Sequence, residues 1–383
     1  MTAPHSLIYL DNNATTRVDP AVLEAMLPYL TELYGNPSSA YRFGKQVDTA
    51  LETARTQVAG LLGCEPQEIV FTSCGTEATN AAILSALSAD PDRQHIVTTR
   101  VEHSATLKMC ETLAKRGVEI TWLGVDSKGQ LDLEETRKAV RADTALLTAM
   151  WANNETGTLF PIDALQRIAR EKGVYFHSDA VQVAGKLPLQ MRQADIQFLS
   201  LSGHKLHCPK GVGALYINRK TRFSPFLVGG SQENGKRGGT QNVASIVGFG
   251  KACELAAATL QADAEQVRVL RDHFEGRVLA EVTGASINGD PVHRLPNTTN
   301  LAFANIDSEA LLLLLDDQGV CCSAGSACTS GSVHPSHVLK AMGHSDAHAR
   351  SSLRFSFSKF NSLAETDHAV AALLKAVAKI RSL

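Results

Sequence analysis

Short apolar runs alternate with amphipathic segments from about residue 68 to residue 217. The runs have the length and the β-branched or aromatic content of strands: EIVFTS, HIVTTRV, VEITWLGV, ALLTAMWA, VYFHSDA, IQFLSLS and VGALYI. Segments such as ATNAAILSAL and PIDALQRIAREKG have helical spacing, and the second ends at Gly173 as a C-cap would. The alternation predicts an α/β fold with a mostly parallel sheet covered by helices on both faces.

The flanking segments have a different pattern. DPAVLEAMLPYL predicts a helix with Asp19 as its cap and Pro20 in its first turn. The basic, glycine-rich GGSQENGKRGGTQN predicts an ordered loop or a partner contact, and a long helix follows from about Ser245 to Leu279. SINGD, NTTNLAFA and SSLRFSFS then predict strands of a second, α+β region. We therefore expect a large domain over 16–257 and a small domain formed by 1–15 and 258–383.

Composition narrows the class of protein. The chain has 383 residues and a net charge of -2, so nothing in its charge favours nucleic acid or an anionic membrane as a partner. The longest apolar run, ALLLLL, is too short to span a bilayer. The N-terminal segment lacks the basic and apolar regions of an export signal, so we expect a cytoplasmic protein with mostly reduced cysteines.

Candidate chemistry lies where strands end, because ligands of such sheets bind beyond the carboxyl ends of the strands. VYFHSDAVQ ends its apolar run at Asp179, with Gln182 three residues later, and FLSLSGHK ends at Lys205. An aspartate and a lysine on neighbouring strand ends could form an ion pair. They also match pyridoxal phosphate, which needs a lysine for covalent attachment and an acid beside its ring nitrogen.

A phosphate site is predicted by IVFTSCGTEATNAAIL, a strand, a turn of small residues and a helix that begins near Thr76. The N–H groups of such a helix end can bind phosphate, although an ordinary cap by Ser73 or Thr76 explains the same residues. The chain has no GxGxxG after a strand and no GxxxxGK[ST], so it lacks the dinucleotide and P-loop fingerprints.

Other strand ends deliver more polar groups. His103 follows HIVTTRVE, and a histidine there could stack on a planar cofactor and move protons. LLTAMWANNETG brings Asn154 to the same rim. SSLRFSFSKF alternates, which separates Arg354 from its apolar neighbours; Arg354 could be a surface charge or a clamp for a substrate carboxylate.

The segment CCSAGSACTSGSVHPSHV is too small and polar to pack as core. We expect the thiol of Cys328 to be accessible there, which suits a nucleophilic or redox role. Cys322, Cys328, His334 and His337 could also ligate a metal, but their spacing matches no common zinc pattern.

Together these motifs resemble the cysteine desulfurases of the NifS/IscS type, in the class-V aminotransferase group of pyridoxal phosphate enzymes. The resemblance runs nearly end to end, and its WANNETGTLFP and SGHKLH motifs are closest to the NifS branch. The motifs, in order, are YLDNNATT, YGNPSS, TSCGTEATN, EHSA, ANNETG, HSDAVQ, SGHKLHCPKGVG, RGGTQN, SAGSACTSG and LRFSFSKF. It implies the fold of type I pyridoxal phosphate transferases.

The resemblance also implies roles for named residues. Lys205 would hold the cofactor covalently, Cys328 would be the catalytic cysteine that takes sulfur from L-cysteine, and His103 would stack on the ring. Further roles are a ring-nitrogen partner (Asp179), ring hydrogen bonds (Gln182, Asn154), phosphate binding (Gly75, Thr76, Ser202, His204, and Thr240 from the other subunit) and substrate carboxylate binding (Asn36, Arg354).

As partners, the resemblance implies a second copy of the chain and an iron–sulfur scaffold that accepts the sulfur, with a possible role in nitrogenase maturation. It implies no permanent metal site, although Cys328 could briefly share a cluster with the scaffold. Cys74 and Cys208 stand where small residues are expected, and Cys321 and Cys322 are an additional thiol pair. Transamination, selenocysteine lysis and a cofactor-free binding protein are the alternatives.

Overall fold

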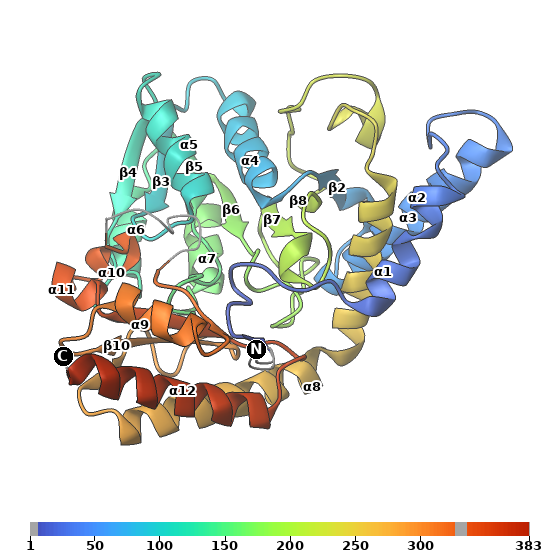
Figure 1. Cartoon of the computed structure of the whole chain (residues 1–383). Coiled ribbons are helices and arrows are strands. Elements are labelled where there is room, and N and C mark those ends of the chain that lie inside the picture. Colours follow the sequence, from blue (N-terminus) through green and yellow to red (C-terminus); the bar gives the residue numbers. More distant parts are fainter. Residues whose placement is uncertain (1–6, 326–334, 383) are drawn as a thin grey trace.

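The structure, a computed structural model, describes residues 7–325 and 335–382. Its centre is a seven-stranded sheet in the order β2-β8-β7-β6-β5-β3-β4 (Figure 1). The strands are β2 (Ile69–Thr72), β3 (His95–Thr99), β4 (Glu119–Leu123), β5 (Thr144–Thr148), β6 (Tyr175–Asp179), β7 (Phe198–Ser202) and β8 (Gly213–Ile217). Only β8 runs against its neighbours, β2 and β7. The mostly parallel sheet predicted from the sequence is confirmed.

Helices cover both faces of this sheet because its strands bury side chains on both sides. Along β5, Leu146 packs with residues of α4 (Gly75–Ala89) and α5 (Ser104–Ala114), whereas Leu147 packs with the helices of the opposite face. That opposite face holds α3 (Arg42–Leu62), α7 (Ile162–Lys172) and part of α8 (Val243–Glu281), with α6 (Leu133–Ala139) beside α7.

The helix boundaries follow local chemistry. The carboxylate of Asp19 accepts a hydrogen bond from the Ala21 N–H and caps α1 (Pro20–Met26), as predicted. Gly173 ends α7 with a φ of 65°, the left-handed conformation that favours glycine. A short α2 (Pro28–Thr31) follows α1, and both lie on an arm that projects from the molecule (Figure 1).

A second region has its own sheet and core. β10 (Thr298–Phe303) lies between β9 (Ala285–Ile287) and β12 (Ser352–Ser356), and β1 (Ile8–Tyr9) pairs with β11 (Val320–Cys321). α9 (Ser308–Asp316), α12 (Leu363–Arg381) and the second half of α8 complete this core. The short α10 (His337–Ala341) and α11 (Asp346–Ala349) pack instead on the core of the large sheet. The domain limits drawn from the sequence remain a prediction.

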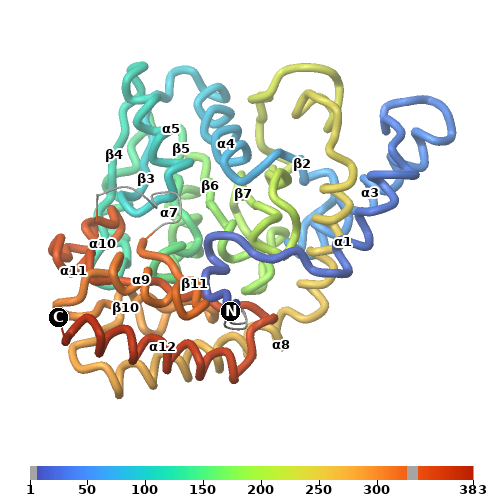
Figure 2. Tube along the Cα trace, viewed as in Figure 1, coloured from blue at the N-terminus to red at the C-terminus, as the bar shows by residue number. Residues whose placement is uncertain are grey.

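Helix α8 connects the two regions along one side of the molecule (Figure 2). By length and composition it could cross a membrane, although its apolar residues do not form one continuous run in the sequence. This is weak evidence for a span, because a core helix has the same properties. In the structure α8 packs against α3, α1 and α12, so its apolar residues already have protein partners.

Candidate functional site

The sheet brings polar residues together at one edge. β2, β3, β5, β6 and β7 all point the same way, so their carboxyl ends meet there. A cavity of about 210 Å³ opens at this edge. Its lining includes most of the predicted site: Gly75, Thr76, His103, Asn154, Asp179, Gln182, Ser202, His204, Lys205 and Arg354. The structure thus brings these residues together at one edge of the sheet, and their roles stay predictions.

Lys205 ends a short 3₁₀ turn (Gly203–Lys205) directly after β7. Its Nζ donates hydrogen bonds to the backbone oxygens of Asn13 and Ala14, at 2.5 and 2.6 Å. These two residues belong to the segment after β1, and both line the cavity. No role was predicted for either residue, although a polar run, Asp11 to Asn13, begins directly after the apolar LIYL run.

Asp179 is the last residue of β6 and only 8% exposed. Burial raises the pKa of its carboxyl group, and His103, the Val181 N–H and Lys205 act in the opposite direction. Because burial outweighs these three groups, the carboxylate is well placed to pair with a cation that enters the cavity. The neighbouring His204 is kept uncharged, because burial and the charge of Lys205 lower its pKa to about 4.

Three details show that the cavity fits pyridoxal phosphate. Gly75 begins α4, and a Cβ there would lie 2.9 Å from Val181 Cγ2, so only glycine leaves the helix end open. The N-cap residue Cys74 makes no side-chain cap, which leaves the N–H groups of the helix end for a phosphate. Gln182 Oε1 is buried without a hydrogen-bond partner in this structure, and a polar ring substituent could reach it.

Arg354 is not a surface charge, because only 1% of it is exposed. Its guanidinium donates to Asp11 Oδ1 at 2.6 Å and to the Asn154 backbone oxygen at 3.0 Å, while Nε is buried without a partner. Its fork is thus fixed by an ion pair that the sequence analysis missed. Substrate carboxylate binding by Arg354 stays a prediction.

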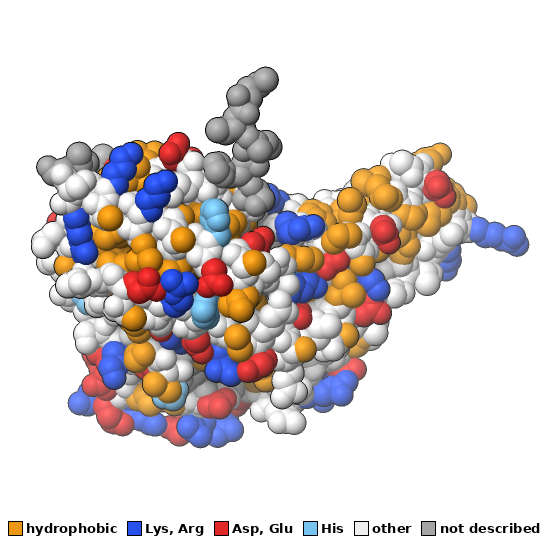
Figure 3. Space-filling model, turned by 60° about the horizontal axis from the view of Figure 1, so that its bottom comes forward, with side chains coloured by type: hydrophobic (Ala, Val, Ile, Leu, Met, Phe, Trp, Pro, Cys, Tyr) orange, Lys and Arg blue, Asp and Glu red, His pale blue; other side chains and the backbone are white. Residues whose placement is uncertain are grey.

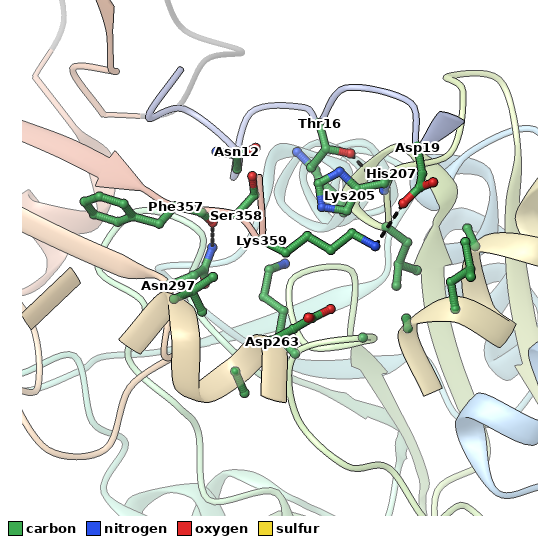
Figure 4. Close-up of a pocket in the computed structure, with 18 of the residues that line it drawn as sticks. Asn12, Thr16, Asp19, Lys205, His207, Asp263, Asn297, Phe357, Ser358 and Lys359 are labelled. Atoms are coloured by element: carbon green, nitrogen blue, oxygen red, sulfur yellow. Dashed lines mark hydrogen bonds and ion pairs between the residues drawn. The ribbon is translucent and has the colours of Figure 1, made fainter. Parts of the chain in front are cut away.

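Lys205 also lines a second cavity, of about 60 Å³, between the two regions (Figure 4). Here Lys359 Nζ forms an ion pair with Asp19 Oδ2 at 2.9 Å, which ties the start of α1 to the segment after β12. Another lysine, Lys186, lines this cavity and donates to the Gln182 backbone oxygen at 3.0 Å. Burial and Lys205 lower the pKa of Lys186 to about 7.

Glu102 lies behind the cavity wall, next to His103. Its Oε1 accepts hydrogen bonds from Thr99 Oγ1 and from the N–H of Met150, a cavity residue, both at 2.9 Å; Oε2 is buried without a partner. Burial raises the pKa of this carboxyl group to about 8. Glu102 is therefore protonated at neutral pH and supports the wall as a neutral group.

We expect Glu102→Gln to change how stability depends on pH. Between pH 4.5 and about 8 the folded wild type holds a proton that the unfolded chain has lost, so its free energy of unfolding falls by up to ~1.4 kcal/mol per pH unit as pH rises. The variant lacks this loss, so its stability relative to wild type should rise across the window and level off above pH 8. Urea unfolding at several pH values measures this difference in the free energy of unfolding. Parallel pH curves for wild type and variant would show that the pKa of Glu102 is not raised.

Some predicted residues are not in the cavity. Asn36 and Thr240 lie together in another hollow, with Tyr29 and Tyr34 of the arm. Cys328 lies outside the described residues, as does His334 of the possible metal cluster. Within the described residues no group of three or more His, Cys, Asp or Glu side chains could hold a metal ion.

Among the additional cysteines, Cys74 lines the cavity, whereas Cys208 and Cys322 are buried. Cys321 pairs with Tyr9 in the small β1–β11 sheet and is partly exposed. These positions make Cys74 the described thiol that a cavity ligand could contact directly.

Comparison with known proteins agrees with this geometry. The family model described as aminotransferase class-V matches residues 8–368. A cysteine desulfurase of Nostoc is 52% identical, covering 99% of this chain and 94% of its own, and the cysteine desulfurase NifS of Azotobacter vinelandii is 51% identical, covering 98% and 94%. The solved structure of a NifS-like protein superposes with a TM-score of 0.92 at 37% identity, covering 98% of this chain and 100% of its own. The chain belongs to the class-V aminotransferase family.

Proposed function

We propose that the protein is a pyridoxal phosphate-dependent cysteine desulfurase, which converts L-cysteine to L-alanine and leaves the sulfur as a persulfide on Cys328. The observation that carries this is the meeting of Lys205, Asp179 and the open end of α4 in one cavity. Relatives named cysteine desulfurase are about half identical to the chain over nearly its whole length. SspA, which superposes with a TM-score of 0.82 at 34% identity, has a solved complex with cysteine.

Different cavity residues would bind different parts of the cofactor. The α4 end at Gly75 and Thr76, with Ser202 and His204, would hold the phosphate, and Lys205 would bind the cofactor covalently. Asp179 would keep the ring nitrogen protonated; Gln182 and Asn154 would hydrogen-bond the ring substituents, and His103 would stack on the ring. When bound, pyridoxal phosphate supplies an electron sink for the bonds at the substrate Cα.

Side chains of this protein would carry out the proton transfers and the sulfur transfer. Lys205 would take the proton from the substrate Cα, and His103 would carry protons at the rim. The Cys328 thiolate would attack the substrate sulfur, so an S–S bond forms as the C–S bond breaks. The electron pair of the C–S bond stays with the carbon, which gains a proton and leaves as alanine. Substrate and thiol together contain every atom of alanine and persulfide, and no external oxidant is needed.

Product analysis tests this proposal. With L-cysteine and a reductant, wild type should release alanine and sulfide in equal amounts. Cys328→Ala should release both at a rate lower by roughly a hundredfold or more, because the nucleophile is gone, while keeping the yellow cofactor. Cys74→Ala is the matched control, since this cavity thiol has no assigned role.

Other results of that assay favour the alternatives. A yellow wild type that releases neither product overturns the substrate assignment and favours transamination. Equal rates for wild type and Cys328→Ala overturn the nucleophile. A colourless protein that binds no pyridoxal phosphate favours a binding protein. Selenocysteine, offered in parallel, tests the second substrate.

Two copies of the chain would form the working unit. Large apolar side chains are exposed on the projecting arm: Leu23, Leu27, Leu30, Tyr34 and Tyr41 (Figure 3). Such a patch supports an interface with a second chain. Thr240 lines a hollow at the base of the same arm, which agrees with its contributing to the phosphate site of the partner rather than of its own chain.

The sulfur acceptor would be an iron–sulfur scaffold protein, with nitrogenase maturation as the process served. The name NifS borne by the Azotobacter relative supports this assignment. We also propose a cytoplasmic location, which the free cysteines among the described residues support, since disulfides are rare in reducing compartments.

A further inference from the structure

Arg237 and Glu77 form an ion pair beside the open end of α4. Arg237 Nε donates to Glu77 Oε1 at 2.9 Å and Nη2 donates to Oε2 at 3.2 Å, so both arms of the guanidinium bind the carboxylate. The two side chains are only 20% and 11% exposed. Glu77 lies in the first turn of α4, directly after Gly75 and Thr76. The pair therefore adjoins the helix end that would bind the cofactor phosphate.

Glu77 also holds the turn that precedes the helix. Its Oε2 accepts a hydrogen bond of 2.8 Å from the N–H of Ser73, the residue that follows β2. Burial opposes ionisation of this carboxyl group, but the hydrogen bonds from Arg237 and Ser73 outweigh burial and lower its pKa. Glu77 is therefore negatively charged at neutral pH. Without a cation beside it, this charge would repel a phosphate at the same helix end.

The loop that carries Arg237 is anchored a few residues earlier. Glu233, in the 3₁₀ turn Gln232–Gly235, accepts hydrogen bonds from Arg55 Nη1 and Nη2 at 2.7 and 3.0 Å and from the Phe71 N–H at 2.9 Å. Its φ is 49°, a left-handed conformation that costs a non-glycine residue free energy, and these three hydrogen bonds hold it there. Because Phe71 belongs to β2, the loop is fixed to the strand that leads into α4.

We propose that Arg237 is a positioning residue for the cofactor phosphate: it neutralises Glu77 and holds it against the turn before α4, so that the helix end stays open to the phosphate and free of a competing negative charge. Arg237 itself lies outside the cavity lining, so it would act through Glu77 and not by touching the cofactor. This role rests on the proposed function, because it needs a phosphate at Gly75 and Thr76.

Binding of pyridoxal phosphate to cofactor-free protein tests this role. Arg237→Met leaves Glu77 without its cation, so the dissociation constant should rise by roughly tenfold to a hundredfold, as expected for like charges at short range in a partly buried site. Pyridoxal, which lacks the phosphate, can still form the bond to Lys205 and should bind wild type and variant equally. Titration followed by the absorbance of the bound ligand measures both constants.

A second substitution separates the effect of charge from the loss of the ion pair. Glu77→Gln removes the negative charge and keeps an oxygen that can accept from the Ser73 N–H. The double variant Arg237→Met/Glu77→Gln should therefore bind pyridoxal phosphate about as tightly as wild type. A merely structural role of the ion pair predicts no such rescue, because the double variant has lost the pair as well.

Arg141→Met is the matched control. Arg141 binds the Glu119 carboxylate with both arms of its guanidinium, at 2.6 and 2.8 Å, but at the start of β4 on the opposite edge of the sheet. This variant should leave the dissociation constant unchanged. Equal affinities of wild type and Arg237→Met for pyridoxal phosphate, an equal loss with pyridoxal, or a double variant as weak as Arg237→Met overturns the positioning role alone. A wild type that binds no pyridoxal phosphate overturns it together with the proposed function.

Discussion

Lys205→Ala should abolish alanine release from L-cysteine, with a rate lower by more than about 10⁴-fold. The variant loses the covalent attachment of the cofactor and also the base at the substrate Cα, and general acid–base catalysis alone contributes roughly 10²–10⁴-fold. Borohydride should fix pyridoxal phosphate to wild type but not to Lys205→Ala. Peptide mapping after reduction measures the attachment, and alanine release measures the turnover.

The chain contains a matched control for this lysine. Lys186 is also enclosed and interacts with Lys205, but it lines the second cavity and not the one with Asp179. Lys186→Met should keep both borohydride fixation and most of the activity. If fixation persists in Lys205→Ala and disappears in Lys186→Met, the lysine that binds the cofactor is Lys186 and not Lys205.

The strand ends could be predicted from the sequence because each strand has its own local apolar pattern, and because strands that follow each other in the chain, such as β6 and β7, are neighbours in the sheet. Each apolar run became a strand within a few residues, and Asp179 and Lys205 are adjacent because β6 and β7 are neighbours in the sheet. Their proximity follows from a parallel ladder with polar residues at its carboxyl edge. Contacts of this kind can be inferred without any knowledge of distant parts of the chain.

Contacts between distant segments could not be inferred in this way. Asn13 and Ala14 accept hydrogen bonds from Lys205 across about 190 positions of sequence, and Asp11 pairs with Arg354 across 343. Nothing in the local pattern around either segment encodes the partner. The alternation in SSLRFSFS correctly separated Arg354 from Leu353 and Phe355, but it could not show that both faces of β12 are buried.

Residues whose roles came from resemblance alone have mixed outcomes. Gly75 leaves the end of α4 open toward the cavity, and Gln182 has a buried oxygen without a hydrogen-bond partner. The geometry therefore supports the predicted roles of both residues independently of the resemblance. Asn36 and Thr240 do not line it. The proposed sharing of the site between two chains would leave no periodic signal in one sequence, and it is supported only by the exposed apolar side chains of the projecting arm.

Asp179→Asn should lower the rate of alanine formation by roughly 10²–10⁴-fold, since removing one partner of a buried charge pair costs about 3–5 kcal/mol. The amide keeps the shape of the side chain and can still accept from the Val181 N–H, now at 2.9 Å. The loss would therefore report the missing negative charge at the ring nitrogen. The absorption spectrum of the bound cofactor should shift as well.

The same substitution should not weaken the fold. Burial raises the pKa of Asp179 even with His103 and Lys205 nearby, so the ionised carboxylate destabilises the fold, and protein freed of cofactor should be at least as stable with asparagine. Asp290 is a suitable control, because it is also buried and accepts the N–H groups of Val292 and His293 outside the cavity. Asp290→Asn should reduce thermal stability and leave turnover unchanged. Opposite effects of two similar substitutions would identify Asp179 as a charge kept for chemistry at the expense of stability; a parallel loss of stability in both would assign Asp179 a structural role.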